Sequence, residues 1–151
     1  MKVVIVGGVA GGATAAARIR RLNEQAEIVV FERSGYISYA NCGLPYYIGD
    51  VITDPEELTL QTPESFFSRF RIIMKVLHEV TAIHHDRKTV SVRNLKTGEE
   101  FEEGYDKLIL SPGAKPTQPK LSGMEANKLF TLRTVEDTFK IKAYINNNHP
   151  K

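Results

Sequence analysis

The residue best suited to chemistry in this chain is Cys42, the only cysteine among its 151 residues. It lies in the segment SYANCGLPYY, residues 38–47, among polar side chains and turn-forming residues. A free cysteine in an apolar core is inert, whereas the dipole of a helix that starts at the cysteine favours the reactive thiolate. If a short helix runs from Cys42 to Tyr47, the sequence predicts a single-thiol redox centre. One cysteine cannot form an intramolecular disulfide, so a disulfide-stabilised secreted scaffold is not expected.

A glycine-rich turn upstream of the cysteine predicts a binding site for the pyrophosphate of a dinucleotide. The turn, residues 7–12, follows the apolar strand predicted over 2–6 and opens a helix, so its N–H groups can approach phosphate oxygens. Val9 replaces the second glycine of the usual G-x-G-x-x-G pattern, and a turn used only for close packing is the competing interpretation. Glu32 ends the next predicted strand, where a carboxylate can bind the ribose. The expected cofactor contacts are Gly7, Gly8, Val9, Ala10, Gly11, Gly12, Glu32 and the adjoining Arg33.

The helix predicted over residues 11–22 has two different faces. One face is small or apolar, which lets the helix lie close to a sheet: Gly12, Ala16 and Ile19. The opposite face carries one hydroxyl and two guanidinium groups: Thr14, Arg18 and Arg21. Guanidinium groups bind phosphate bidentately, although a solvated cationic face has the same spacing. The spacing alone favours a solvated cationic face that points away from the core.

The remaining patterns predict an α/β fold. Two buried strands, residues 2–6 and 27–32, enclose the first helix in a Rossmann-like β-α-β unit with a parallel sheet. Thr62-Pro63-Glu64 predicts the start of a helix that runs to about Phe70. An antiparallel meander is expected over about residues 72–110, from strand-like segments at 72–77, 79–85, 88–94, 99–103 and 106–110. A last helix is expected from Thr134 to about Ile145.

Composition and charge favour a globular protein of the cytoplasm. The chain is 42% hydrophobic and 25% charged, and its net charge of +2 is too small to indicate nucleic acid or a membrane surface as partner. The apolar N-terminus is interrupted by four glycines between residues 7 and 12, and its helical pattern continues through Arg18 and Arg21, unlike a signal peptide. No metal site is expected, because His84 and His85 point to opposite faces of a strand.

These motifs resemble the N-terminal part of the coenzyme A-disulfide reductases, the single-cysteine branch of the FAD-dependent pyridine nucleotide-disulfide oxidoreductases. The resemblance covers essentially the whole chain. It rests on VVIVGGVAGGATAAARIRRL, SYANCGLPYYIGDV, LQTPESF, HEVTAI and YDKLILSPGAKP. It implies that NAD(P)H reduces FAD, and that FAD reduces Cys42. The cysteine in turn exchanges with coenzyme A disulfide through a mixed disulfide.

The resemblance also assigns roles to residues. Cys42 is the redox nucleophile, Ser38 and Asn41 flank the substrate sulfur, and the coenzyme A site is lined by Thr14, Arg18 and Arg21. The family often has a lysine contact near the start of the segment that follows the helix beginning at Thr62-Pro63-Glu64. At that place this chain has Phe70, between Arg69 and Arg71.

The resemblance further implies a domain organisation. Residues 1–115 are expected to form the N-terminal portion of an FAD-binding domain, with the redox-active segment 38–47 and the meander of about 72–110. Residues 116–151 are expected to form a linker and helix leading to a nicotinamide-binding domain outside the chain. The parent enzyme is expected to be a homodimer, and the 151-residue chain alone is expected to be inactive.

Two alternatives remain at this point. NADH peroxidases and oxidases of the same superfamily cycle one cysteine through a sulfenic acid, but typically have a histidine in the glycine-rich turn. This chain has Val9 and Ala10 there, and it has Asn41 where those enzymes usually have serine. The other alternative, from a different class, is a nucleotide-binding module without catalysis.

Overall fold

The computed structural model describes residues 1–118, 121–122 and 129–149. Its internal contacts divide the chain into two compact units. The first, called here the sheet unit, consists of Met1–Tyr39 and Thr59–Gly113. The second, called the helical unit, consists of Ala40–Leu58 and Ala114–Lys151.

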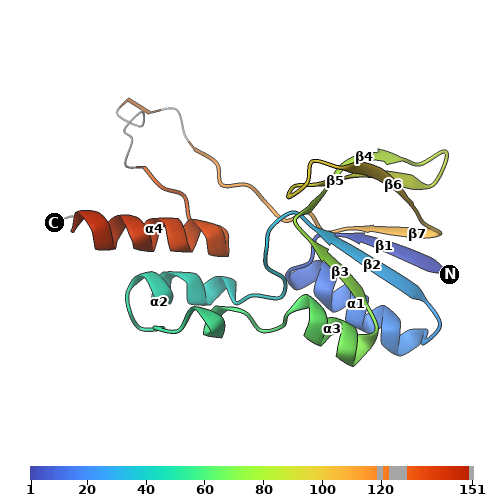
Figure 1. The fold of residues 1–151 in the computed structure, drawn as a ribbon, viewed down its shortest axis with the longest axis horizontal. Coiled ribbons are helices and arrows are strands. Elements are labelled where there is room, and N and C mark those ends of the chain that lie inside the picture. Colours follow the sequence, from blue (N-terminus) through green and yellow to red (C-terminus); the bar gives the residue numbers. More distant parts are fainter. Residues whose placement is uncertain (119–120, 123–128, 150–151) are drawn as a thin grey trace. The chain divides into compact units, whose positions relative to one another are not determined.

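The centre of the sheet unit is a four-stranded parallel sheet with the strand order β3-β2-β1-β7 (Figure 1). Its strands are β1 (Lys2–Val6), β2 (Glu27–Glu32), β3 (Ile73–Val76) and β7 (Lys107–Leu110). Helix α1 (Ala10–Leu22) connects β1 to β2, which pair in parallel. The bounds of β1 and β2 agree with the prediction to the residue, and the predicted β-α-β unit is confirmed.

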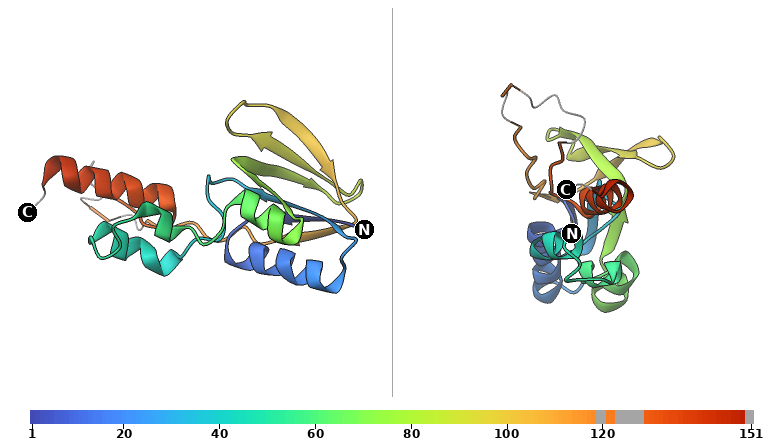
Figure 2. Two further views of the ribbon diagram at one scale, coloured as in Figure 1. Left: turned by 60° about the horizontal axis from the view of Figure 1, so that its bottom comes forward. Right: turned by 90° about the vertical axis from the view of Figure 1, so that its left-hand side faces the viewer.

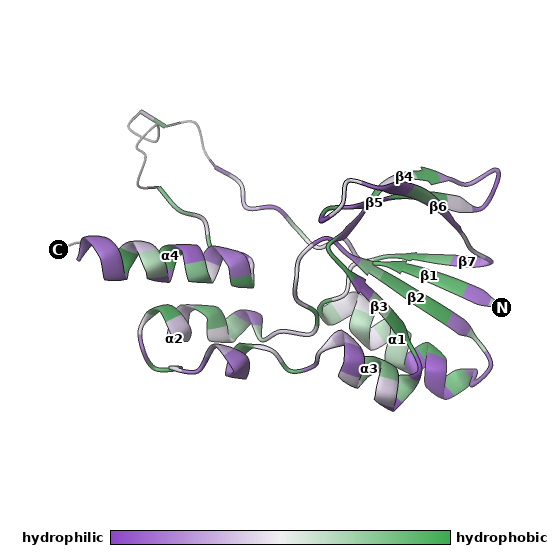
Figure 3. Cartoon of the chain, in the orientation of Figure 1, coloured by the Kyte–Doolittle hydropathy of each residue, from purple (hydrophilic) through white to green (hydrophobic). Residues whose placement is uncertain are grey.

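The parallel sheet is covered on both faces. Figures 1 and 2 show α1 and α3 (Pro63–Phe70) on one face and the antiparallel strands on the other. Alternate residues of β1 and β2 serve the two layers because successive side chains of a strand point to opposite faces. The helix side receives Val3, Ile5, Ile28 and Val30, and the other side receives Val4, Val29 and Phe31. This explains why both strands read as continuous apolar runs, and Figure 3 shows them as predominantly hydrophobic.

The antiparallel meander contains three strands: β4 (His78–His84), β5 (Thr89–Asn94) and β6 (Glu100–Gly104). The predicted extent of the meander, about 72–110, was therefore wrong at both ends. The first and last segments, β3 and β7, pair in parallel with β2 and β1 instead. Their partners lie far away in the sequence, and a short apolar run indicates a strand without indicating which sheet it joins.

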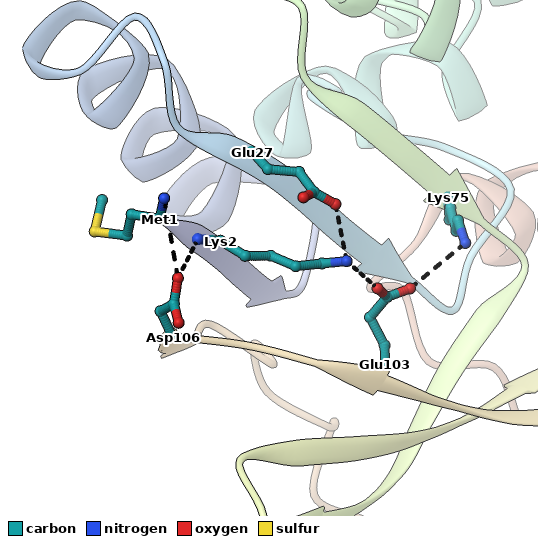
Figure 4. A network of polar contacts seen from close by, with 6 residues as sticks. All are labelled: Met1, Lys2, Glu27, Lys75, Glu103 and Asp106. Atoms are coloured by element: carbon teal, nitrogen blue, oxygen red, sulfur yellow. Dashed lines mark hydrogen bonds and ion pairs between the residues drawn. The ribbon is translucent and has the colours of Figure 1, made fainter.

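A network of charged groups joins the meander to the parallel sheet (Figure 4). Lys2 Nζ lies 2.6 Å from Glu103 Oε1 and 2.8 Å from Glu27 Oε1, and Lys75 Nζ lies 3.8 Å from Glu103 Oε2. The backbone N–H of Lys2 also donates to Asp106 Oδ2 at 2.6 Å. Hydrogen bonds to Glu103 and Glu27 raise the pKa of Lys2 above its ordinary value. Glu103 lies on β6, so this network fixes the meander against the strands it covers.

The helical unit contains two short helical turns, η1 (Asn41–Gly43) and η2 (Pro55–Leu58), and two α-helices, α2 (Leu44–Ile48) and α4 (Val135–Asn148). Thr134 caps α4, as the predicted start requires, by accepting a hydrogen bond from Asp137 N. The predicted end at Ile145 was too early, because the helix continues through the three asparagines. It stops at His149, whose φ is 42°. In the part of the chain that the structure describes, no helix has both the length and the apolar character needed to cross a membrane.

Candidate functional site

The glycine-rich turn brings the start of α1 close to the end of β1. Gly7 has a φ of 99°, and a Cβ atom there would overlap the carbonyl oxygen of Ser111. A Cβ atom at Gly12 would overlap the carbonyl oxygen of Gly7. Val9, at the N-cap, has no side chain that can cap the helix, and the first turn has no acidic residue. Since the first N–H groups of a helix have no partner within the helix, this end is suited to an anion.

Glu32 lies beside this turn and is buried. Its Oε2 accepts a hydrogen bond from Gly8 N at 2.7 Å, and its Oε1 accepts one from Ser34 N at 2.8 Å. Each carboxylate oxygen has two acceptor positions, so each retains one for a ligand hydroxyl. The carboxylate is thus held in one orientation by the backbone.

A cavity of about 110 Å³ adjoins Glu32 at the carboxyl ends of β1 and β2. Open α/β sheets bind nucleotides at this edge. The cavity is lined in part by residues that the sequence predicted for cofactor binding, namely Gly7, Glu32 and Arg33. It is also lined by His78, Glu79 and Val80 from β4, which the sequence analysis did not identify as site residues. Only the packing of the meander over β2 brings these three residues to the cavity, so no local pattern identifies them.

A second cavity, of about 410 Å³, lies between α1 and α3 and is called here the cationic groove. Four of the predicted substrate-binding residues come together in its lining: Thr14, Arg18, Arg21 and Ser38. The described residues that line it include no carboxylate. The helical spacing of the first three residues, used as a prediction from sequence, therefore corresponds to one wall of a real groove.

The opposite wall of the cationic groove comes from α3 and the residues before it. It contributes Gln61, Phe66, Arg69 and Phe70. The sequence analysis predicted α3 within its observed bounds, but it did not place these residues at a site. Arg69 is of particular interest because it is the third guanidinium group in the lining, and its Cζ lies 5.2 Å from the centre of the Phe70 ring.

Arg20 has a different role from its neighbours Arg18 and Arg21. Its Nε donates to Phe70 O at 2.7 Å, and its Nη2 donates to Arg71 O at 2.9 Å. These bonds join the end of α1 to the end of α3. Arg20 therefore holds the two walls of the cationic groove together.

Cys42 lies in the helical unit, and its side chain is exposed. The predicted helix from Cys42 to Tyr47 is present in two parts, a tight turn over Asn41–Gly43 followed by α2 from Leu44. Leu44 is buried, and Gly43 N donates to Ala40 O at 2.9 Å, so the residues after the cysteine anchor the turn. In this chain Cys42 is thus not packed in an apolar core.

The other two predicted catalytic residues lie on either side of the boundary between the units. Asn41 is in the helical unit, and its Oδ1 accepts a hydrogen bond from Arg133 Nη1 at 3.4 Å. Ser38 is in the sheet unit, where its N–H donates to Gly8 O at 3.2 Å and its carbonyl accepts from Leu60 N at 3.0 Å. The structure thus groups Ser38 with the cationic groove and Asn41 with Cys42.

Comparisons with known proteins agree with these features. Residues 1–149 match the family model described as pyridine nucleotide-disulphide oxidoreductase. Coenzyme A disulfide reductase from Staphylococcus aureus (strain bovine RF122 / ET3-1) is 51% identical over 147 residues, which cover 97% of this chain and 33% of that protein. The chain thus spans about a third of the length of this curated relative.

Solved structures show the same likeness. The crystal structure of reduced CoADR-RHD from Bacillus anthracis has a TM-score of 0.95 and 55% identity, covering 99% of this chain and 27% of that chain. An NAD-dependent persulfide reductase from A. fulgidus has a TM-score of 0.90 and 34% identity, covering 98% of this chain and 28% of that chain. With the glycine-rich turn, the buried Glu32 and the exposed Cys42 in place, the chain belongs to the pyridine nucleotide-disulphide oxidoreductase family.

Proposed function

We propose that the protein containing this chain is an FAD-dependent oxidoreductase that uses NAD(P)H to reduce coenzyme A disulfide, or a related disulfide or persulfide, through Cys42. The observation that carries this proposal is the cationic groove, in which Thr14, Arg18 and Arg21 line one wall. Coenzyme A disulfide is rich in phosphate, and the relatives named above reduce coenzyme A disulfide or persulfides.

The residues at the carboxyl ends of β1 and β2 fit the adenosine and pyrophosphate parts of FAD. The turn over residues 7–12 offers backbone N–H groups and too little space for side chains at Gly7 and Gly12. Glu32 offers acceptors for the ribose hydroxyls, and Arg33 lines the same cavity. When bound, FAD supplies a two-electron relay between a nicotinamide and a thiol or disulfide.

The cationic groove fits the phosphate groups of coenzyme A. Arg18 and Arg21 provide guanidinium groups, which bind phosphate through paired hydrogen bonds. Thr14 and Ser38 add hydroxyl groups. The proposal gives Ser38 and Asn41 the further role of flanking the sulfur atom of the bound substrate.

The chemistry assigned to Cys42 is thiol–disulfide exchange. Its thiolate attacks one sulfur of the substrate, the substrate S–S bond breaks, and a new S–S bond joins Cys42 to one coenzyme A. The other coenzyme A leaves as a thiolate and takes a proton from water. Two electrons that originate from NAD(P)H then cleave the mixed disulfide, which releases the second coenzyme A and restores the Cys42 thiolate. The exposure of Cys42 gives a disulfide access to the sulfur atom.

The proposal extends to the organisation of the protein. Residues 1–115 are assigned to FAD binding, and residues 116–151 to a linker and helix that lead to a nicotinamide-binding domain. These boundaries follow the proposed functions of the residues. They differ from the sheet unit and the helical unit, which are defined by the contacts within the chain. The protein is proposed to act as a homodimer in the cytoplasm.

The decisive experiment is an activity assay on the complete gene product. We expect a bound flavin and consumption of NADH or NADPH that depends on coenzyme A disulfide. Cys42→Ser is expected to abolish this reduction and to leave the flavin bound. Consumption that depends on peroxide or oxygen instead of a disulfide would favour the sulfenic acid alternative, and absence of both flavin and turnover would favour the non-catalytic module.

A further inference from the structure

Helix α4 holds the segment that carries the thiol, residues 41–50, called here the thiol segment. The strongest contact is made by Lys142, whose Nζ donates to Ile48 O at 3.0 Å and lies 2.5 Å from Asp50 Oδ1. The Lys142 side chain is only 13% exposed, whereas that of Asp50 is 75% exposed. The lysine side chain therefore extends from α4 to the thiol segment and is mostly shielded from solvent.

The two acceptors of Lys142 lie at the end of α2. The last carbonyl groups of a helix have no partner within it, and a cation there interacts favourably with the helix dipole. A largely buried ammonium group needs its acceptors, because an unpaired buried charge is costly. Ile48 and Asp50 are consequently held at fixed positions relative to α4.

Helix α2 depends on this support, because it has only five residues and isolated short helices are unstable in water. Further contacts from the α4 region reach the same segment. The rings of Tyr47 and Phe139 meet edge to face with centres 5.6 Å apart, and Arg133 reaches Asn41 at 3.4 Å. Contacts with the α4 region are therefore distributed from Asn41, beside the cysteine, to Asp50.

We infer that Lys142 is a positioning residue for the proposed reaction: it fixes the end of α2 and thereby the turn that presents Cys42. The inference rests on the proposed role of Cys42 as the redox thiol. Lys142 contacts Ile48 and Asp50, at the opposite end of the thiol segment from Cys42, so its effect is assigned to α2 and not to contact with the substrate.

The test compares Lys142→Met with Lys140→Met in the complete, flavin-loaded gene product. Lys140 lies two positions away on the same helix with an exposed side chain, so its variant is a matched control. We expect kcat with coenzyme A disulfide to fall about tenfold in Lys142→Met, since a displacement of about 1 Å can cost up to ~10²-fold in rate. KM is expected to change less than about twofold, because the substrate-binding arginines lie in the sheet unit. Lys140→Met is expected to behave as the unmodified protein.

A second measurement follows the thiol segment directly. The N–H groups of Gly49 and Val51 donate to Pro45 O and Tyr46 O. We expect faster hydrogen exchange at these amides in Lys142→Met, and restoration of both exchange and kcat in Lys142→Arg, which retains the charge and the donors. If Lys142→Met does not fold, Asp50→Asn weakens the same contact from its exposed side and is expected to shift kcat in the same direction.

The outcomes separate this inference from the proposed function. Unmodified kcat and exchange in Lys142→Met would overturn the inference while the reductase assignment stands. A loss in kcat that Lys142→Arg does not restore, accompanied by a similar loss in substrate binding and in thermal stability, would indicate a purely structural role and would also overturn it. If the unmodified gene product does not reduce coenzyme A disulfide, the proposed function fails, and hydrogen exchange alone then decides whether Lys142 holds the segment.

Discussion

Gly8 donates its backbone N–H to the buried carboxylate of Glu32 at 2.7 Å. The acid predicted to bind a ribose is thus also a structural partner of the turn predicted to bind a pyrophosphate. The two parts of the proposed dinucleotide site are fixed to each other before any ligand arrives. This relationship makes Glu32 the most informative residue to change.

Glu32→Gln is expected to lower the free energy of unfolding by about 1–3 kcal/mol, because the amide group brings a donor to a place where two N–H groups need acceptors. Flavin is also expected to be lost more readily on dilution. Urea unfolding and the ratio of flavin to protein absorbance measure the two effects. Glu24→Gln, at an exposed position, is the control. Unchanged stability and flavin content in Glu32→Gln would contradict the described geometry.

Gly12→Ala tests the close approach of α1 to β1. A Cβ atom would overlap the carbonyl oxygen of Gly7, so we expect a loss of about 1–3 kcal/mol in the free energy of unfolding from backbone displacement. Gly104→Ala is the matched control, because a Cβ atom there meets nothing within 4 Å. Equal melting temperatures for the two variants would argue against a tight turn.

Arg69→Gln tests the third guanidinium group of the cationic groove. We expect KM for coenzyme A disulfide to rise about fivefold, with kcat nearly unchanged, because a partly exposed phosphate contact contributes about 1 kcal/mol to binding in both ground and transition states. The disulfide of pantetheine, which carries no phosphate group, is expected to show no such rise. Arg71→Gln serves as control, since that side chain does not line the groove. A similar rise in KM for both substrates would remove Arg69 from phosphate recognition.

Glu103→Gln tests the network of Figure 4 through its dependence on pH. The pKa of Lys2 is raised first by Glu103 and then by Glu27, so the folded state holds this proton more tightly than the unfolded state does. The stability gained is fully present below the unfolded pKa, about 10.4 for lysine. It is lost as the pH rises through the higher folded pKa.

The unmodified protein is therefore expected to be more stable than Glu103→Gln near neutral pH, and the difference is expected to close at strongly alkaline pH. Urea unfolding at a series of alkaline pH values measures this difference. A difference that stays constant through the titration of lysine would show that the charge of Lys2 does not contribute.

Much of the fold could be predicted because its signals are local. The strand 27–32 has four apolar residues between two glutamates, and its bounds match the prediction to the residue. Thr62-Pro63 likewise marks the start of α3. The face of α1 that carries Arg18 followed from helical geometry alone. The sequence did not show which sheet β3 and β7 join, because their parallel partners lie far away in the chain.

The candidate site was predicted less completely because it also combines residues that lie far apart in the sequence. The spacing along α1 defines one wall of the cationic groove, but Arg69 joins it only because α3 and β3 pack beside α1 and β2. Nothing in the sequence indicates that Lys142 contacts the thiol segment, since a lysine on an amphipathic helix usually faces water. Its two acceptors lie 92 and 94 positions earlier, a separation that no periodic pattern spans.

The backbone of Gly8 bonds two neighbours through its two adjacent peptide groups. Its N–H is bonded to Glu32 of the dinucleotide site, and its carbonyl accepts a hydrogen bond from Ser38, which lines the cationic groove. A displacement of the Gly8 backbone would therefore alter contacts at both proposed binding regions. Substitutions that change cofactor binding at the turn are therefore expected to change substrate affinity as well, because both regions are bonded to the backbone of Gly8.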